Sequence, residues 1–444
     1  MRAPSPLARL AENLDRRIGR RADPPSLWPT GWASLLSHAA IVAFILLTVT
    51  GLALAIAYRP STAPITYEGA SELYDGEELP HAFASVIRIS EDLPGGALLR
   101  RVHVASSHLL LIALVAHLLR VLATGAFRHP RLRNHLIGVG LLLVSLGFAY
   151  TGELMPFTLV ASSSLRIAAA IIGSLPVVGE PLGQLVIGSE LPSDRILVAA
   201  WALHVVLLPA AFVGLLGLHL HLVRRHTPGS GRRPDIDVTT TTPGRPLWPD
   251  AVARFSLLTT LLTALILASA VVVPWSDVEL EGPFYAAEAT NSVHPTWPLF
   301  FTTGSLRILP AIDLTFAGVR ITSVLVAGAL VPGILVAMVA AYPFMERRIT
   351  GDRDANYTLD HPLDVPFRAG TVAGLTSVAV VLSLGAGVDV LSYWLHVPVE
   401  RIVLAFRIAL VTVPALSAGA AVRTARRRSV AATPPSAPSP VVGR

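Results

Sequence analysis

Two apolar stretches of the sequence each carry a pair of histidines. His103 and His117 are fourteen residues apart in the first stretch, and His204 and His219 are fifteen residues apart in the second. Histidine inside a membrane-spanning helix is costly, so we expect it to serve a function. With a helical rise of about 1.5 Å per residue, the members of each pair lie ~21 Å and ~22.5 Å apart and within ~40° and ~60° of one helix face.

Two such helices side by side would present two pairs of imidazoles at two matching depths. Haem iron accepts one imidazole nitrogen from each side. The pattern therefore predicts two b-type haems stacked across a membrane, close enough together for electron transfer between them. The pairs are His103 with His204, and His117 with His219.

Two further histidines in these stretches are not assigned to a haem. A single membrane histidine is most simply explained by a hydrogen bond to a neighbouring helix, and this is our interpretation of His108. His221 lies ~100° away from the face of His204. It is a poorer ligand than His219, although a shift of register would exchange the two.

The composition excludes several other kinds of site. The chain has no cysteine, which rules out disulfides, cysteine-ligated zinc, iron–sulfur clusters held by this chain and covalently attached c-type haem. Of its 444 residues, 52% are hydrophobic and 14% are charged, whereas soluble domains carry about 25% charged residues. This is the composition of a membrane protein.

Eight stretches are apolar enough, at about 20 residues each, to cross a bilayer as helices. They are residues 33–57, 102–124, 136–155, 197–222, 253–274, 320–345, 368–388 and 400–421. The apolar run 165–173 is interpreted as a short helix at the membrane surface, because turn residues follow it closely. The predicted fold is therefore all-α, a polytopic membrane protein with eight transmembrane helices and a dihaem four-helix bundle at its core.

The placement of the arginines sets the expected orientation. All 35 basic residues are arginines, and most lie in the two terminal segments and in the loops on the same side of the membrane. The positive-inside rule then places both termini in the cytoplasm, in a multi-pass protein of the inner (plasma) membrane, and disfavours nucleic-acid binding. The expected organisation is a cytoplasmic segment 1–32, a four-helix dihaem domain 33–226, a linker 227–251, a C-terminal four-helix domain 252–424 and a disordered tail 425–444.

Small and basic residues support the histidine pattern. Gly138 and Gly152 share the fourteen-residue spacing, and Gly51 occupies a similar place in the first span. A flat macrocycle can pack against backbone where no Cβ intervenes, although close helix packing is an alternative use of each glycine. Arg100 and Arg120 flank the first histidine pair and could bind haem propionates, or extend to the membrane surface instead.

These residues resemble the cytochrome b of quinol–cytochrome c reductases, the cytochrome bc complexes, and most closely the actinobacterial type. The resemblance covers roughly residues 30–425. Its motifs include ArgArgValHis (100–103), ThrGlyAlaPheArgHisProArg (124–131), SerLeuProValValGly (174–179), AlaLeuHisValValLeuLeuPro (202–209), TyrProPheMetGlu (342–346) and AspHisProLeuAspValProPheArg (360–368).

The resemblance implies a cofactor set, partners and an activity. His103 and His204 would bind the outer haem, and His117 and His219 the inner one. In the family, quinol at an outer pocket gives one electron to a Rieske-type iron–sulfur protein and the other to the two haems, which reduce quinone at an inner pocket. The resemblance further implies menaquinone as the quinone, a cytochrome c subunit, a quinone pool in a lipid membrane and a homodimeric complex.

The outer pocket departs from the family pattern. The family carries Pro-Glu-Trp-Tyr or Pro-Asp-Trp-Tyr, whereas this chain has Pro-Thr-Trp-Pro, with Thr296 in place of the acid and Trp297 retained. Threonine cannot accept the proton that quinol oxidation releases. On the other wall, Glu153 replaces a tyrosine of the family. Glu153, Glu288 and His294 are therefore the candidate proton acceptors.

Two interpretations of this departure remain open. In the first, one of these residues has taken over as proton acceptor and the pocket still oxidises quinol. In the second, the chain is a non-bifurcating dihaem conduit within another membrane redox complex. A third class, a haem-free transporter or helical scaffold, would show no haem absorbance.

The inner pocket is less clearly marked. Arg224 follows His219 by five residues, and Arg254 begins the fifth span. The acid expected after Arg254 is Phe255, and Asp250 could substitute for it. These three charged residues, Arg224, Asp250 and Arg254, are candidates for an inner quinone site, although surface charge would explain them equally.

Overall fold

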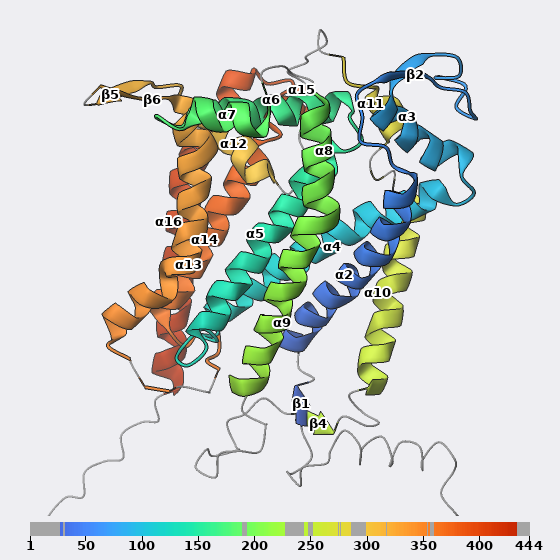
Figure 1. Ribbon diagram of the computed structural model, residues 1–444. Helices are drawn as coiled ribbons and strands as arrows, with labels where there is room; N and C mark the ends of the chain where they lie inside the picture. The colour runs from blue at the N-terminus through green and yellow to red at the C-terminus, as the bar shows by residue number, and fades with distance from the viewer. Residues whose placement is uncertain are drawn as a thin grey trace, which may run out of the picture.

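The structure is a computed structural model, and it describes residues 27–29, 32–188, 193–226, 244–246, 252–273, 275, 277–285, 299–316, 318–352, 354–355 and 359–432. Within these ranges, eight helical segments are long and apolar enough to cross a membrane, which confirms the predicted eight spans and all-α fold. Figure 1 shows them side by side as one upright bundle. They are α2 (Trp32–Ala57), α4 (Gly96–Ala123), α5 (Leu132–Leu154), α8 (Asp194–Ala202) continuing through η2 (Leu203–Leu207) into α9 (Leu208–His226), α10 (Val252–Val272), η6 (Leu325–Leu330) continuing into α13 (Val331–Thr350), α14 (Pro366–Gly385) and α16 (Val399–Ala432).

Short elements cover the end of the bundle that is uppermost in Figure 1, which we name the outer end. They are α3 (His81–Ile87), η1 (Arg88–Asp92), α6 (Leu159–Gly173), α7 (Gly179–Val186), α11 (Val278–Glu281), α12 (Phe300–Ile308), α15 (Val388–Leu395) and the antiparallel strand pairs β2 (Pro64–Thr66) with β3 (Glu78–Pro80) and β5 (Leu314–Phe316) with β6 (Val319–Ile321). The predicted surface helix is α6, which is too short to span a membrane. It begins six residues before the predicted run, because the Thr158 side chain caps it by accepting a hydrogen bond from the Ala161 N–H.

The opposite end, the inner end, carries strand β1 (Leu27–Pro29) paired antiparallel with β4 (Gly244–Pro246). Most of the predicted segments 1–32 and 227–251 lies outside the described residues. The segment 425–444 was predicted to be disordered, but helix α16 continues through Ala432, past residue 425. Its last turns are rich in alanine and arginine, both good helix formers.

Helices α2, α4, α5 and α9 pack around a core of small residues and aromatic rings. Ala43 and Ala113 are almost completely buried, and such small side chains let helix backbones approach closely. Phe44 and Phe212 stack at 4.4 Å between ring centroids. This four-helix group, with the η2 turn that leads into α9, holds all four paired histidines.

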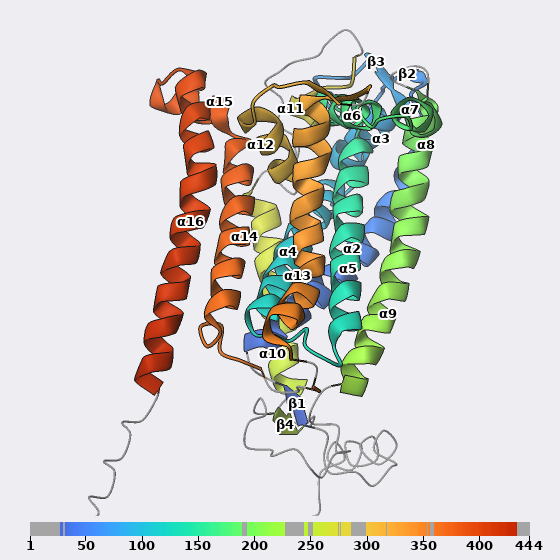
Figure 2. The ribbon, with the colours of Figure 1, turned by 90° about the vertical axis from the view of Figure 1, so that its left-hand side faces the viewer.

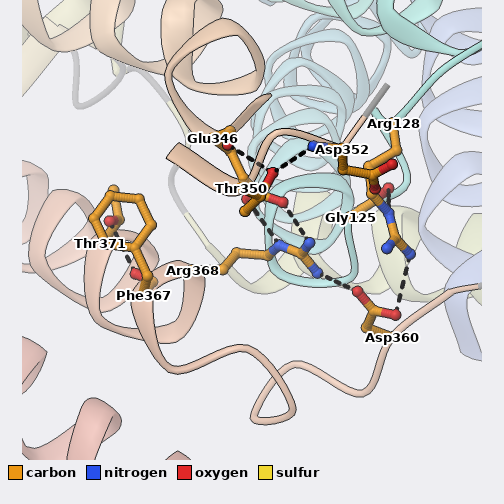
Figure 3. A network of polar contacts seen from close by, with 9 residues as sticks. All are labelled: Gly125, Arg128, Glu346, Thr350, Asp352, Asp360, Phe367, Arg368 and Thr371. Carbon is orange, nitrogen blue, oxygen red and sulfur yellow. Dashed lines mark hydrogen bonds and ion pairs between the residues drawn. The ribbon is translucent and has the colours of Figure 1, made fainter. Parts of the chain in front are cut away.

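A buried ionic network joins this group to the helices α13 and α14 near the inner end (Figure 3). The Arg368 guanidinium is 2% exposed and donates to the carboxylates of Glu346, at 3.0 Å, and Asp360, at 2.7 Å. Arg128 pairs with Asp360 at 3.1 Å. Two cations thus meet two anions, so the burial of charge is compensated. Gly125, at φ +66°, follows α4 and leaves room for the guanidinium, since a Cβ there would lie 2.7 Å from Arg368 Nη1.

Candidate functional site

The structure brings the four histidines together as the two predicted pairs. The ring centroids of His103 and His204 are 6.3 Å apart, and those of His117 and His219 are also 6.3 Å apart. Two imidazoles cover this span when one metal ion lies between their facing nitrogens, because each metal–nitrogen bond takes about 2 Å and the remainder lies within the rings. Both pairs are formed between α4 and the α8–α9 segment.

Threonine hydroxyls fix the tautomers of the outer pair. Thr50 Oγ1 donates to the Leu46 carbonyl at 2.7 Å and lies 2.8 Å from His103 Nδ1. Because its hydrogen is used within the helix, this oxygen accepts from the imidazole, which places the ring proton on Nδ1 and leaves Nε2 unprotonated. Thr151 makes the same arrangement, donating to Gly147 and lying 2.9 Å from His204 Nδ1. Hydrogen bonding of the second nitrogen is the usual support for a metal-bound histidine.

The two threonines belong to an internal repeat. Thr50 and His103 recur 101 positions later as Thr151 and His204 (151 − 50 = 204 − 103 = 101). The contact of Thr50 on α2 with His103 and the contact of Thr151 on α5 with His204 are therefore the same local arrangement. At the inner pair the copies differ. Ser37 Oγ lies 3.0 Å from His117 Nδ1, whereas the repeat places Gly138 at the corresponding position, and His219 Nδ1 has no hydrogen-bond partner among the described residues.

Two of the three predicted glycines lie beside the outer histidine pair. A Cβ on Gly51 would be 3.1 Å from His103 Cε1, and a Cβ on Gly152 would be 2.9 Å from His204 Cε1. Both glycines therefore leave room for a ligand ring, a closer role than the macrocycle contact we predicted. A Cβ on Gly138 would meet nothing within 4 Å, so that glycine borders open space in the bundle.

A π-helical turn explains why the second pair is spaced by fifteen residues. The segment η2, Leu203–Leu207, is π-helical and contains His204. One such turn accommodates an additional residue, and π-bulges are frequent at functional sites. The extra residue is absorbed at this turn, and His204 and His219 both face α4.

The remaining histidines of these spans lie elsewhere. His108 Nδ1 is 2.7 Å from the Val104 carbonyl, and its ring packs 4.6 Å from Trp275. His221 is exposed, whereas His219 is partly buried opposite His117. Among the described residues there is no group of three or more metal-binding side chains. Pairs of neutral imidazoles fit an iron whose other four ligands are supplied by a porphyrin.

Charged residues gather at the outer end, near the carboxyl end of α5. Glu153 is partly buried and accepts a hydrogen bond from Ser164 of α6 at 2.5 Å. The backbone after α11 packs against the start of α6, because the Leu159 N–H donates to the Gly282 carbonyl and the Phe284 N–H donates to the Phe157 carbonyl. The other predicted outer-pocket residues, Glu288, His294, Thr296 and Trp297, lie outside the described residues.

Glu281 is a carboxylate of this region that our sequence reasoning missed. Burial raises the pKa of Glu281, against a hydrogen bond to Thr158 and the charge of Arg100, both of which favour ionisation. The negative charge of Glu153 also raises this pKa, so the two carboxylates are near each other. Arg100, predicted to bind a propionate, donates from Nε to Ser90 Oγ at 3.0 Å. Only the docking of the loop on α6 brings Glu281 here.

The residues predicted for the inner pocket are less closely grouped. Arg120 is partly buried three positions after His117, and Arg224 and Arg254 are exposed at the ends of α9 and α10. Asp250 lies outside the described residues. A residue that sequence reasoning missed, His38, joins α2 to α10: its Nε2 lies 2.8 Å from Thr259 Oγ1, and its ring stacks on Phe255 at 5.0 Å.

Comparison with known proteins gives a consistent result. The family model described as "Cytochrome b(N-terminal)/b6/petB" matches residues 108–283. The cytochrome bc1 complex cytochrome b subunit of Corynebacterium diphtheriae is 31% identical over 422 residues, which is 93% of this chain and 76% of that protein. The corresponding subunit of Mycobacterium tuberculosis is 30% identical over 417 residues, 92% of this chain and 75% of that protein.

A solved structure shares the fold. The chain matches a structure titled "Hyperthermophilic respiratory Complex III" with a TM-score of 0.65 and 17% identity, covering 92% of this chain and 98% of the other. Three findings agree with one another: eight helices long and apolar enough to cross a membrane, two histidine pairs between α4 and the α8–α9 segment, and relatives that align along nearly the whole chain. The chain belongs to the family of cytochrome b subunits of cytochrome bc1 complexes.

Proposed function

We propose that this chain is the dihaem subunit of a menaquinol:cytochrome c reductase and carries electrons between two quinone sites. The observation that supports this most is the distance of 6.3 Å between the ring centroids of each histidine pair. In the outer pair, the hydrogen bonds to Thr50 and Thr151 hold the ring protons on Nδ1. His103 and His204 would hold the outer haem, and His117 and His219 the inner haem. When bound, the haems would supply one-electron transfer, and the protein would supply their ligands and a path across the bilayer.

Haem content tests the ligand assignment. We expect the wild-type chain in its complex to bind two b haems, and His103→Ala or His117→Ala to bind one, measured as haem per protein with a reduced-minus-oxidised spectrum. His108→Gln and His221→Gln serve as matched controls from the same spans, and both should keep two haems. Loss of a haem from His221→Gln but not from His219→Gln would overturn the inner assignment.

The outer carboxylates would take over the task of the missing acid. Oxidation of a quinol breaks two O–H bonds, releases two protons and transfers two electrons. One electron would pass to a Rieske-type iron–sulfur protein and the other to the outer haem. Glu153, partly buried in the last turn of α5 and hydrogen-bonded to Ser164, would accept one proton. Glu288 and His294 remain the other candidates for this role, and Thr296 and Trp297 would belong to the same pocket.

Quinol-dependent haem reduction distinguishes an active pocket from a simple conduit. We expect Glu153→Gln to slow the reduction of the haems by quinol at least tenfold while leaving haem content unchanged. Glu180→Gln, at an exposed glutamate of α7 on the same end, is the matched control. An unchanged rate in Glu153→Gln would remove this residue from the mechanism. A complex that binds both haems and has no quinol:cytochrome c activity would favour the non-bifurcating conduit.

Further parts of the proposal concern the surroundings of the chain. Both termini would lie in the cytoplasm, because the arginines gather at that side. Since the chain has no cysteine, the iron–sulfur and c-type centres would reside on partner subunits, in a homodimeric complex. Arg100 and Arg120 would bind haem propionates. Arg224, Asp250 and Arg254 would border the inner quinone site.

A further inference from the structure

His38 joins two helices at the inner end of the bundle and belongs to neither histidine pair. Its Nε2 lies 2.8 Å from Thr259 Oγ1 of α10, and its ring stacks on Phe255 with the two ring planes 22° apart. Both α2 and α10 begin at the inner end, where β1 and β4 lie below α10 in Figure 2. His38 is partly exposed and Thr259 is exposed, so a molecule dissolved in the membrane can reach this contact.

His38 lies at the depth of the inner histidine pair. The Oγ of the preceding residue, Ser37, is 3.0 Å from His117 Nδ1. Successive residues of a helix differ by ~1.5 Å in height and by ~100° in direction. Helix α2 therefore contacts His117 through Ser37 and presents His38 to α10 at almost the same height.

The contact with Thr259 sets which nitrogen of His38 can take up a proton. Thr259 Oγ1 donates to the Phe255 carbonyl at 2.8 Å, so this oxygen accepts the hydrogen bond from His38 Nε2. In the neutral imidazole the other nitrogen, Nδ1, then carries no hydrogen. Nδ1 can therefore gain a proton and give it away again while the bond from Nε2 to Thr259 holds the ring in place.

The helices around the inner pair offer no carboxylate that could supply protons there. Helices α2, α4, α9 and α10 contain no aspartate or glutamate, and the single glutamate of α5, Glu153, lies in its last turn at the outer end. The other charged residues of these helices are arginines, which do not give up their protons. Histidine exchanges a proton near neutral pH without any shift of its pKa.

The other histidines near the inner end of these helices are placed less well for this task. His135 is 3% exposed, and its Nε2 lies 3.0 Å from a backbone carbonyl of α13. His221 is turned ~200° away from the direction of His219 on α9. His226, the last residue of α9, lies ~10.5 Å along the helix beyond His219. Among these histidines, His38 alone combines the depth of the inner pair with an exposed position.

We propose that His38 binds the quinone of the inner site through Nδ1 and gives it a proton. This rests on the proposed function, because it names a residue for the quinone reduction that the function includes. Reduction of a quinone to a quinol takes up two electrons, which the proposed function assigns to the inner haem, and two protons, and it forms two O–H bonds. His38 breaks its Nδ1–H bond to protonate one quinone oxygen and regains a proton from water at the inner end. The same water protonates the other oxygen.

Two variants of His38 in the purified complex separate hydrogen bonding from proton transfer. Asparagine places an amide near the position of Nδ1, so His38→Asn can still bond to a quinone but cannot protonate it, whereas His38→Leu can do neither. We expect His38→Asn to keep its bound menaquinone, counted by mass spectrometry, and His38→Leu to lose one equivalent. Reoxidation of the prereduced inner haem by added menaquinone should slow at least tenfold in both. His108→Asn, at another membrane histidine, is the matched control and should resemble the wild type in both measurements.

Further measurements distinguish proton transfer from a structural role. Both His38 variants should keep two haems and an unchanged midpoint potential of the inner haem, because Ser37 and His117 remain in place. Phe255→Asp introduces a carboxylate beside position 38, since the rings of His38 and Phe255 are 5.0 Å apart. The double variant His38→Asn/Phe255→Asp should therefore recover at least half of the wild-type rate of reoxidation.

The wild-type rate of reoxidation in His38→Asn would overturn this proposal and leave the proposed function standing. A lost haem or a shifted inner-haem potential in that variant would overturn it in favour of a structural role through Ser37. If Asp250→Asn lost the rate and His38→Asn kept it, Asp250, which lies outside the described residues, would be the proton donor instead. A wild-type complex whose inner haem is not reoxidised by menaquinone would overturn the proposed function, and this proposal with it.

Discussion

Replacing Thr50 with valine should raise the midpoint potential of the outer haem. Thr50 Oγ1 accepts a hydrogen bond from His103 Nδ1 at 2.8 Å, and this bond gives the imidazole more anionic character. An electron-rich ligand stabilises the oxidised iron relative to the reduced iron. Valine has nearly the same shape as threonine but cannot accept the bond, so the oxidised state loses part of its stabilisation.

The hydrogen bond sets an upper limit to the shift. A net hydrogen bond contributes about 0.5–1.5 kcal/mol, and ~1.4 kcal/mol corresponds to 59 mV for a one-electron couple. If the whole bond discriminated between the two oxidation states, the potential would rise by ~20–65 mV. Redox titration of the haem absorbance in the purified complex measures this directly.

The chain offers a matched control and two related variants. Thr48, two residues away on α2, is exposed and donates only to the Phe44 carbonyl, so Thr48→Val should leave both potentials unchanged. Thr151→Val should move the outer haem in the same direction, whereas Ser37→Ala should move the inner haem. Equal potentials in Thr50→Val and Thr48→Val, or a shift confined to the inner haem, would refute the reasoning.

Three further predictions concern packing, charge and pH. Gly152→Ala should lose the outer haem, because its Cβ would lie 2.9 Å from His204 Cε1, whereas Gly214→Ala, with nothing within 4 Å, should keep both haems, as haem per protein will show. Arg368→Met leaves the buried Glu346 unpaired and should destabilise the fold by about 3–5 kcal/mol, against at most about 1 kcal/mol for the exposed pair of Arg320, measured by chemical unfolding. Burial raises the pKa of Glu281, so the folded chain keeps this proton at a pH where the unfolded chain has lost it, and stability falls as the pH rises through that range. The Tm of Glu281→Gln relative to the Tm of the wild type should therefore rise as the pH increases from acidic to neutral. A difference in Tm that stays constant over this pH range would contradict this.

The sequence by itself determined the spans and the histidine pattern. Apolar stretches of about 20 residues can satisfy their backbone only as helices in a bilayer, so eight helices followed from length and hydropathy. The pairing of His103 with His204 and of His117 with His219 followed from helical periodicity. The same arithmetic predicted that the second pair would be ~60° out of line, and it could not show how the chain corrects this.

The tertiary structure decided the features that depend on contacts between distant segments. The π-helical turn at His204 is a local deviation that no spacing rule announces, and it aligns the fifteen-residue pair. The hydroxyl partners of His103 and His204 come from α2 and α5, fifty-three residues away in each case. The sequence contained both threonines, yet only helix packing turns their oxygens toward the imidazoles.

The outer end of the bundle shows the same division for a physical reason. Glu281 acquires its surroundings from the docking of a loop on α6. Periodicity within one helix is fixed by backbone geometry, so the sequence reveals it. The distance between two helices is fixed by the side chains that meet there, and only the assembled bundle shows which side chains those are.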